Sequence, residues 1–309
     1  LALTATDFCG NMIVEKTKIP YVYENTEENL ELLGQILNDY IDNLPIKRDD
    51  ILNVCINIAE RVNPFEGTTY TCFSFTEGPL ADTISKMIKL PVCIENDTRS
   101  MTYAEYVKGC CKGLKDVVFV NVCWGLGIGI IVNGELYYGK SGYSGEFGHN
   151  PAYNNNIICH CGKIGCVETE ASGRALTRKL TEAIQAGKQS ILSEKVIERK
   201  EELTLVDTLE AISKEDVLSL ATLQQVADEL GKQLAGVINV FNPEMLVIGG
   251  EMSVTGNYLT LPITMGIMRY SLNIMNEDSK IVTSELKDQA GVLGACLMAR
   301  YRLLFSSEK

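Results

Sequence analysis

Three cysteines and a histidine form the densest group of soft metal ligands in the sequence. Cys159, Cys161 and Cys166 lie close together, and His149 precedes them. Thiolate sulfur and imidazole nitrogen are the ligands that tetrahedral zinc prefers. Three unrelated thiols in a loop are the alternative, and the density of the thiols favours zinc. Because protein groups fill all four positions, we expect a structural zinc that does not activate water.

His160 competes with His149 for the fourth position of this metal site. It is nearer in sequence, yet it lies between two cysteines whose side chains would converge on the ion. We therefore expect its ring to turn outward. We assign the fourth position to His149.

Two glutamates accompany the metal loop. Glu146 precedes His149 by one turn, and Glu168 follows Cys166 closely. A surface position is ordinary for any single glutamate. Two of them tethered to one metal loop favour a site for the hydroxyl groups of a polyol or a sugar.

Asn96 and Asp97 mark a second candidate site, at the junction of an apolar strand and a helix. Ligands of α/β proteins bind at the carboxyl ends of parallel strands. Asn and Asp also cap helices well. Capping and ligand binding therefore stand as equal interpretations of this pair.

Glycines recur at two strand ends where a backbone could approach a phosphate. Gly125, Gly127 and Gly129 alternate along one strand, and Gly249 and Gly250 follow another. Close approach to a nucleotide is one explanation and a simple turn is the other. The sequence contains neither a Walker loop nor a G-x-G-x-x-G motif.

The elements that must position these residues alternate between strands and helices. Asn133-Gly134 between apolar runs predicts a tight hairpin. Such alternation predicts sheets covered by helices, and a strand-hairpin-helix block that occurs twice indicates a duplicated α/β domain with a cleft between the copies. We expect strands or hairpins at 1–8, 12–22, 51–59, 90–96, 115–122, 127–139 and 244–250, and helices at 26–44, 79–89, 97–108, most of 174–235 and 291–304.

Composition and charge exclude several classes of protein. Of 309 residues, 46% are hydrophobic and 22% charged, which excludes a disordered chain, and the net charge of −12 argues against a nucleic-acid surface on these residues. We find no apolar run long enough for a bilayer and no secretion signal, so we expect no membrane contact and a cytoplasmic location with reduced cysteines. Leu1 begins inside a strand-like run, and we expect further residues upstream.

Taken together, four motifs resemble those of the ROK family of repressors, open reading frames and sugar kinases, and most closely its sugar-responsive regulators. The motifs are ENDxxxxxxxE at 95–105, GEFGH at 145–149, CHCGKIGCVE at 159–168 and VIGG at 247–250. The resemblance implies an α/β, actin-like ATPase fold of the hexokinase and ribonuclease H type, with a sugar cleft between two α/β domains. We predict one domain at 1–108 plus 290–309, truncated at its first strand, and a second at 109–289 that carries the zinc loop.

The resemblance also implies roles for individual residues. Asp97 would be the catalytic base of a kinase, and Glu60 stands where the family's loop has a glycine before the arginine. The nucleotide contacts would come from Gly125, Gly127, Gly129, Gly249 and Gly250. The sugar contacts would come from Arg61, Asn96, Asp97, Glu146, His149 and Glu168.

Two functions compete for these residues, and the resemblance implies two nucleotide elements that separate them: a first phosphate loop, expected just upstream of Leu1, and the segment before Gly127. The family's kinases carry Gly-Thr-Gly where this chain has Cys123-Trp124-Gly125, and an indole can donate only through its ring nitrogen. We therefore predict the sugar-sensing and oligomerisation region of a repressor, a homodimer or tetramer. It would bind a hexose, an N-acetylhexosamine or its phosphate, and operator DNA through an upstream helix-turn-helix. The alternative is a sugar kinase using ATP and Mg²⁺, and a third is a zinc protein with neither activity.

Overall fold

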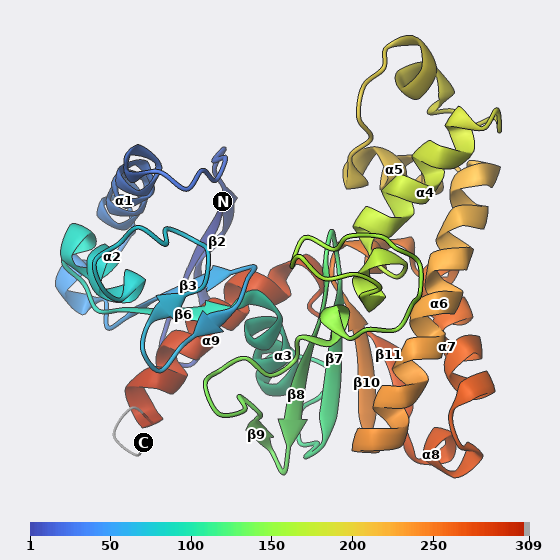
Figure 1. The fold of residues 1–309 in the computed structure, drawn as a ribbon. Coiled ribbons are helices and arrows are strands. Elements are labelled where there is room, and N and C mark those ends of the chain that lie inside the picture. Colours follow the sequence, from blue (N-terminus) through green and yellow to red (C-terminus); the bar gives the residue numbers. More distant parts are fainter. Residues whose placement is uncertain (306–309) are drawn as a thin grey trace. The chain divides into compact units, whose positions relative to one another are not determined.

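The computed structural model describes residues 1–305 and divides the chain into two compact units (Figure 1). Unit 1 comprises Leu1–Lys112, Leu136–Ser144 and Asp288–Lys309. Unit 2 comprises Gly113–Glu135 and Gly145–Lys287. The chain therefore leaves unit 1, returns to it for one short segment, and returns again for its last helix.

The short segment Leu136–Ser144 is grouped differently from the predicted second domain at 109–289. It is compact with unit 1 because Arg99 donates from one guanidinium nitrogen to the carbonyl of Gly142, at 2.5 Å. Arg302 also lies over the Tyr138 ring, 5.2 Å from its centroid. The predicted domain boundaries at 1–108, 290–309 and 109–289 stay a prediction, because a compact unit need not be a domain that folds on its own.

Unit 1 is built on paired strands covered by helices. The predicted hairpin at its start is confirmed, with β1 (Ala2–Thr6) antiparallel to β2 (Met12–Lys18). The two predicted buried strands, β3 (Val54–Ile58) and β6 (Val92–Asn96), pair in parallel. Alternate residues of a strand face opposite sides, so the two faces of this pair take different helices. The remaining elements are β4 (Val62–Asn63), β5 (Thr68–Thr69), α1 (Glu27–Asp42), α2 (Leu80–Ile88), α3 (Asp97–Lys108) and α9 (Ala290–Phe305).

Helices α1 and α2 pack on the face of β3 that carries Val54, Ile56 and Ile58. Asn57 points to the other face, where its side-chain amide donates to the carbonyl of Gly291 in α9 and its oxygen accepts from Ser100 in α3. The two faces therefore differ in chemistry, since one packs aliphatic side chains against its helices and the other also makes partly buried hydrogen bonds to them.

Unit 2 is built on one five-stranded sheet in the order β11-β10-β7-β8-β9. β10 (Met245–Gly249) is parallel to both β7 (Val117–Val122) and β11 (Lys280–Thr283), and β7 is antiparallel to β8 (Leu126–Val132). The predicted hairpin at Asn133-Gly134 is confirmed, since both residues have positive φ, as a tight hairpin turn requires. Its second strand, β9 (Glu135–Leu136), has two residues.

Long helices cover one face of this sheet. The expectation of helix through most of 174–235 is confirmed, apart from a π-helical turn at Glu194–Glu198 and the loops around it. Leu126, Ile128 and Ile130 of β8 join the core beneath these helices, which leaves Gly127 and Gly129 on the opposite face. The helices are α4 (Gly173–Gln185), α5 (Leu205–Ser213), α6 (Val217–Phe241), α7 (Asn257–Tyr270) and α8 (Asn273–Asp278).

No helix among residues 1–305 combines the length and the apolar character needed to span a membrane.

Candidate functional site

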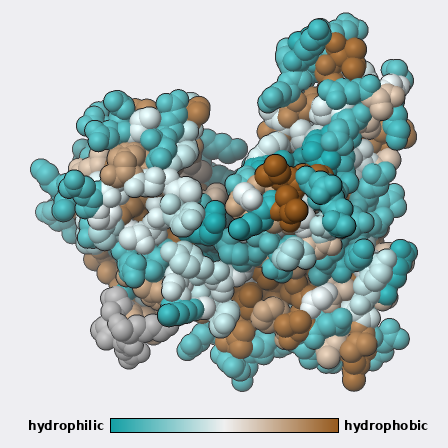
Figure 2. Space-filling view, in the orientation of Figure 1, coloured by the Kyte–Doolittle hydropathy of each residue, from teal (hydrophilic) through white to brown (hydrophobic). Residues whose placement is uncertain are grey.

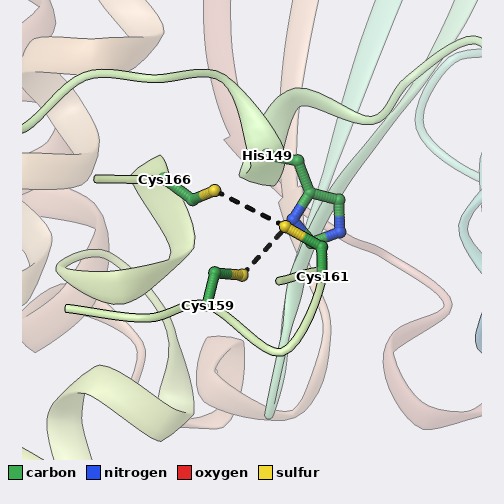
Figure 3. Close-up of side chains that lie close together, drawn as sticks. All are labelled: His149, Cys159, Cys161 and Cys166. Atoms are coloured by element: carbon green, nitrogen blue, oxygen red, sulfur yellow. Dashed lines mark hydrogen bonds between the residues drawn. The ribbon is translucent and has the colours of Figure 1, made fainter. Parts of the chain in front are cut away.

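The predicted ligands Cys159, Cys161, Cys166 and His149 converge in unit 2 (Figure 3). The sulfurs of Cys161 and Cys166 lie 3.7 Å apart, and the Cys159 sulfur lies 3.6 Å from Nδ1 of His149. One ligand atom from each of the four lies within 4.8 Å of all the others. The group could therefore hold a metal ion.

The geometry of the cluster suits tetrahedral zinc. A zinc–sulfur bond of about 2.3 Å and tetrahedral angles place two thiolates about 3.8 Å apart, close to the spacing of Cys161 and Cys166. Burial raises the pKa of the Cys159 thiol to about 12, so without a metal this group stays protonated. Thiolates are the form that binds zinc, and metal binding therefore releases protons here.

The loop between the ligands folds through glycines and two isolated bridges. Gly162 and Gly165 both have positive φ, and a side chain at Gly165 would collide with the carbonyl of Tyr153. Bridges join Pro151 to Cys166 and Ile158 to Ile164. Both isoleucines are exposed, and Figure 2 shows hydrophobic surface over this loop. The two isoleucines therefore add little apolar burial to the loop, which is shaped by its glycine turns and backbone bridges.

His149 presents its two ring nitrogens to different partners. Nδ1 faces the thiol of Cys159, whereas Nε2 lies 3.7 Å from a carboxylate oxygen of Glu146. One nitrogen can therefore bind a metal while the other meets a polar ligand. The predicted double role of His149 is compatible with this arrangement.

His160 behaves differently from the expectation that its ring turns outward. The ring is 44% exposed, but its Nδ1 turns inward and lies 2.7 Å from Oε1 of Glu168. It also makes an edge-on contact with the ring of His149. The sequence reasoning missed this contact because it asked only which histidine binds the ion. The closeness of Glu168 to the last ligand, Cys166, was the signal available.

Glu168 is buried and held at both of its oxygens. Oε2 accepts from the backbone N–H of Leu126 at 3.1 Å, and Oε1 accepts from His160. Its own carbonyl accepts from the hydroxyl of Ser172, the N-cap of α4. A side chain at Gly125 would begin 2.9 Å from Oε2. The absence of a side chain at Gly125 therefore leaves room for the Glu168 carboxylate.

Asn96 and Asp97 lie in unit 1, at the carboxyl end of β6 and the start of α3. Capping is confirmed, because the side chain of Asn96 accepts from the N–H of Arg99 at 3.1 Å. The Asn96 amide donates to Oδ1 of Asp97 and to the carbonyl of Glu60. Oδ1 of Asp97 also accepts from the N–H of Thr98. The half-buried Asp97 is thus oriented by its neighbours at the sheet edge.

Buried charged side chains hold the β6–α3 junction in place. Oε1 of Glu95 accepts from Nε of Arg99 at 2.7 Å and from the N–H of Asn96 at 2.8 Å, and Oε2 accepts from Arg302 at 3.2 Å. Glu95 and Arg99 have almost no exposed surface. Such a network is costly to break, because a lone buried charge remains. The sequence reasoning used Glu95 only as part of a motif.

Arg61 stacks on an aromatic ring beside this junction, and its neighbour Glu60 holds the loop. The guanidinium carbon of Arg61 lies 4.7 Å from the centroid of the Tyr70 ring. The Glu60 carboxylate accepts from the backbone N–H groups of Thr71 and Cys72. Glu60 therefore turns toward the loop at 71–72, where it takes the place of backbone partners.

Two further glycines predicted to contact a nucleotide have packing explanations. A side chain at Gly249 would collide with the Phe119 ring, and one at Gly250 would lie 2.6 Å from the N–H of Val122. Gly250 also has a positive φ of 86°. Close strand packing thus accounts for Gly249 and Gly250, and nucleotide contact at them, as at Gly125, Gly127 and Gly129, stays a prediction.

Trp124 lies at the surface, in the turn between β7 and β8. Its indole is 42% exposed, and the Arg174 guanidinium lies over it, 5.6 Å from the ring centroid. The carbonyl of Trp124 accepts from the N–H of Arg174 at 3.0 Å. This large side chain therefore points out of the core at the turn where a nucleotide loop is expected.

Comparison with known proteins identifies the family. A family model described as "ROK family" matches residues 2–302. The chain belongs to the ROK family. Its structural neighbours in that family have the actin-like fold of sugar kinases and regulators, so the predicted fold class is confirmed.

The ROK relatives include regulators and kinases. A xylose repressor from Caldicellulosiruptor bescii is 28% identical, over 95% of this chain and 73% of the repressor. A ROK transcriptional regulator, described as a homologue of the E. coli MLC protein, has a TM-score of 0.81 at 31% identity, over 96% of this chain and 75% of its own. A ROK glucokinase from Streptomyces griseus, in complex with glucose and AMPPNP, has a TM-score of 0.80 at 25% identity. The match covers 96% of this chain and 95% of the glucokinase.

The predicted sugar-binding residues of this ROK protein therefore form two groups. Arg61, Asn96 and Asp97 belong to unit 1, where the last two are in contact. Unit 2 holds the other group. That group comprises Glu146, His149 and Glu168, and its members surround the thiol cluster.

Proposed function

We propose that this chain is the sugar-sensing region of a ROK transcriptional repressor. The observation that carries the proposal is the exposed Trp124 under Arg174, in the turn where the family's kinases place a small phosphate-binding loop. Phosphoryl transfer depends on positioning, and an indole in that turn obstructs close backbone approach to a phosphate. The similarity to a repressor and to a regulator supports the same function.

The proposed ligand is a hexose or an N-acetylhexosamine, or its phosphate. Asp97, Glu146, Glu168 and the side-chain oxygen of Asn96 would accept hydrogen bonds from its hydroxyl groups, and Arg61 would donate. Carboxylates that are already oriented by protein donors bind hydroxyls without reorganising. The sugar would act as an effector by binding one conformation of the protein more tightly than another.

The proposed metal is one structural zinc ion, held by Cys159, Cys161, Cys166 and Nδ1 of His149. Zinc with four protein ligands stabilises a fold and leaves no open position for water. Its contribution would be to shape the loop that carries Glu168. His149 would then keep Nε2 for the sugar.

The proposed assembly is a homodimer or tetramer that binds operator DNA through a helix-turn-helix outside this sequence. The charge of −12 supports a DNA contact elsewhere than on these residues.

The second candidate is an ATP-dependent hexose or N-acetylhexosamine kinase. The observation that favours it is Asp97 at the β6–α3 junction, oriented by Asn96 and Thr98 as a general base must be. The similarity to a glucokinase in complex with glucose and AMPPNP supports it as well. In that function Asp97 would take the proton from the attacking hydroxyl, ATP would supply the γ-phosphoryl group and leave as ADP, and Mg²⁺ would neutralise the phosphate charge.

One assay separates the two candidates. Sugar-dependent ADP release is measured across glucose, mannose and N-acetylglucosamine, with Asp97→Asn as the control. Thermal stabilisation by each sugar and by its 6-phosphate is measured in parallel. The sensor function predicts stabilisation without turnover. Turnover that Asp97→Asn abolishes would identify a kinase, and the absence of any stabilisation would remove sugar binding from both candidates.

A further inference from the structure

Resting on the proposed sugar function, we infer that His160 is a positioning residue: its Nδ1–H holds Oε1 of Glu168 so that this carboxylate reads one particular sugar hydroxyl. The contact measures 2.7 Å, the length of a charge-assisted hydrogen bond. A carboxylate only accepts, so Nδ1 is the donor.

The surroundings of Glu168 give His160 a specific task. The backbone of Glu168 is fixed by its carbonyl bond to Ser172, which has no exposed surface. One carboxylate oxygen is fixed by the N–H of Leu126 at 3.1 Å. The other oxygen has His160 as its short partner, since the Cys159 sulfur is 3.7 Å away. Without His160, that oxygen would lose its only close partner among the described contacts.

The remaining capacity of Glu168 is what a ligand can use. An ionised carboxylate has about four acceptor positions. Leu126, His160 and the distant Cys159 thiol occupy at most three of them. Because the carboxylate is held at both ends, the direction of the remaining acceptor position is set before a sugar arrives, which favours one hydroxyl over its epimer.

The position of His160 in the loop links this direction to the metal ligands. It lies between Cys159 and Cys161, and its ring packs edge-on against the ring of His149, with 5.1 Å between the two ring centroids. A loop shaped by its ligands therefore presents the Nδ1 donor at a fixed place, in the way that neighbouring groups orient the residues of a metal site.

The test uses two variants of matched shape. His160→Asn keeps an amide donor at the place of Nδ1, whereas His160→Leu has the same branched shape and no donor. The sugar that stabilises the wild type most, among glucose, mannose, N-acetylglucosamine and their 6-phosphates, is titrated against the fluorescence of Trp124, the single tryptophan of the chain. Zinc per chain is measured on the same samples, and the titrations are repeated with each monodeoxy analogue of that sugar.

We expect His160→Leu to raise the Kd about tenfold and His160→Asn to raise it less than threefold, with zinc per chain unchanged in both. For one deoxy analogue, the one that lacks the hydroxyl read by Glu168, wild type and His160→Leu should bind equally. A ring needed only for packing would instead weaken all analogues alike.

Three results would overturn the inference. They are unchanged binding by His160→Leu, equal losses in the Leu and Asn variants, and loss of zinc from His160→Leu, which would make the residue a metal ligand. A wild type that binds none of the sugars would refute the proposed function instead, and the unchanged zinc content would show that the loop itself is intact.

Discussion

The two groups of candidate sugar-binding residues are held in place by different physical means. In unit 1, Asn96 and Asp97 lie where β6 becomes α3, and the buried Glu95, Arg99 and Arg302 fix that junction. In unit 2, Glu146 and Glu168 flank a loop with almost no regular structure, which is gathered by three thiols and an imidazole. A carboxylate can thus be oriented by secondary structure and ion pairs, or by a loop of candidate metal ligands and short hydrogen bonds.

Because of this difference, we expect the two groups to respond to different substitutions. Regular elements persist without any one side chain, since their backbone hydrogen bonds remain. A loop with few buried apolar contacts has little else to hold it once its ligands are removed. A substitution that disturbs the geometry of one group should therefore leave the geometry of the other group unchanged.

The largest effect is expected from removing one thiol of unit 2. Cys161→Ser should abolish zinc binding and lower sugar affinity at least ~100-fold, about 2.8 kcal/mol, because Glu168 loses its shaped loop. Zinc analysis and titration calorimetry measure both quantities. Cys9→Ser, which removes an exposed thiol of unit 1, is the control and should change neither. Full sugar affinity in a zinc-free Cys161→Ser protein would show that the metal ligands do not orient Glu168.

A smaller effect is expected from breaking the buried ion pair of unit 1. Arg99→Met should lower the free energy of unfolding by about 3 kcal/mol, because Glu95 keeps only Arg302 as a charged partner. Lys214→Met breaks the exposed Glu210–Lys214 pair, which has the same i,i+4 spacing, and should cost less than about 0.5 kcal/mol. Urea denaturation of both variants gives the difference. Equal costs, or zinc loss in Arg99→Met, would show that the two supports are not distinct.

Adding one methyl group beside Glu168 should have a more modest effect. Gly125→Ala places a Cβ 2.9 Å from Oε2 and should weaken sugar binding about tenfold. Gly236→Ala in α6 meets no atom within 4 Å and should leave affinity unchanged while stabilising the fold by about 0.5 to 1 kcal/mol. If both variants bind sugar like the wild type, the crowding of Glu168 by residue 125 is unimportant for recognition.

The smallest effect is expected from the two N-caps. Thr26→Ala in α1 and Ser172→Ala in α4 should each cost about 1 kcal/mol of stability in thermal denaturation. Only Ser172→Ala should also reduce sugar affinity, by a few-fold, because Ser172 donates to the carbonyl of Glu168. A sugar affinity that responds to Thr26→Ala would contradict the assignment of recognition to these two groups.

Much of the fold and part of the candidate site could be predicted from the sequence. The ligand spacing of the thiol cluster, the helix expected from residue 26 and the turn at Asn133-Gly134 are local signals. The structure brings the four ligands together and confirms the helix and the turn. The partners that meet over long sequence distances could not be predicted. Arg302 reaches Glu95 and Leu126 reaches Glu168 because the fold brings them together, and no residue near either partner indicates the contact.

Glycine patterns were the least informative signal. The alternation at 125–129 was compatible with a phosphate site or with a turn, and the structure shows Gly125 beside Glu168 and places Gly127 and Gly129 on the face of β8 away from the core. A missing side chain records only that something lies close by. Its neighbour can be a ligand, a carboxylate or another strand, and only the structure distinguishes them.

The most direct test of the whole account is amide hydrogen exchange with and without the sugar that stabilises the protein most. We expect one sugar to protect both the β6–α3 junction around Asn96 and Asp97 and the loop from Glu146 to Glu168, and we expect Asp97→Asn to abolish both effects. Protection confined to one of the two segments would contradict it.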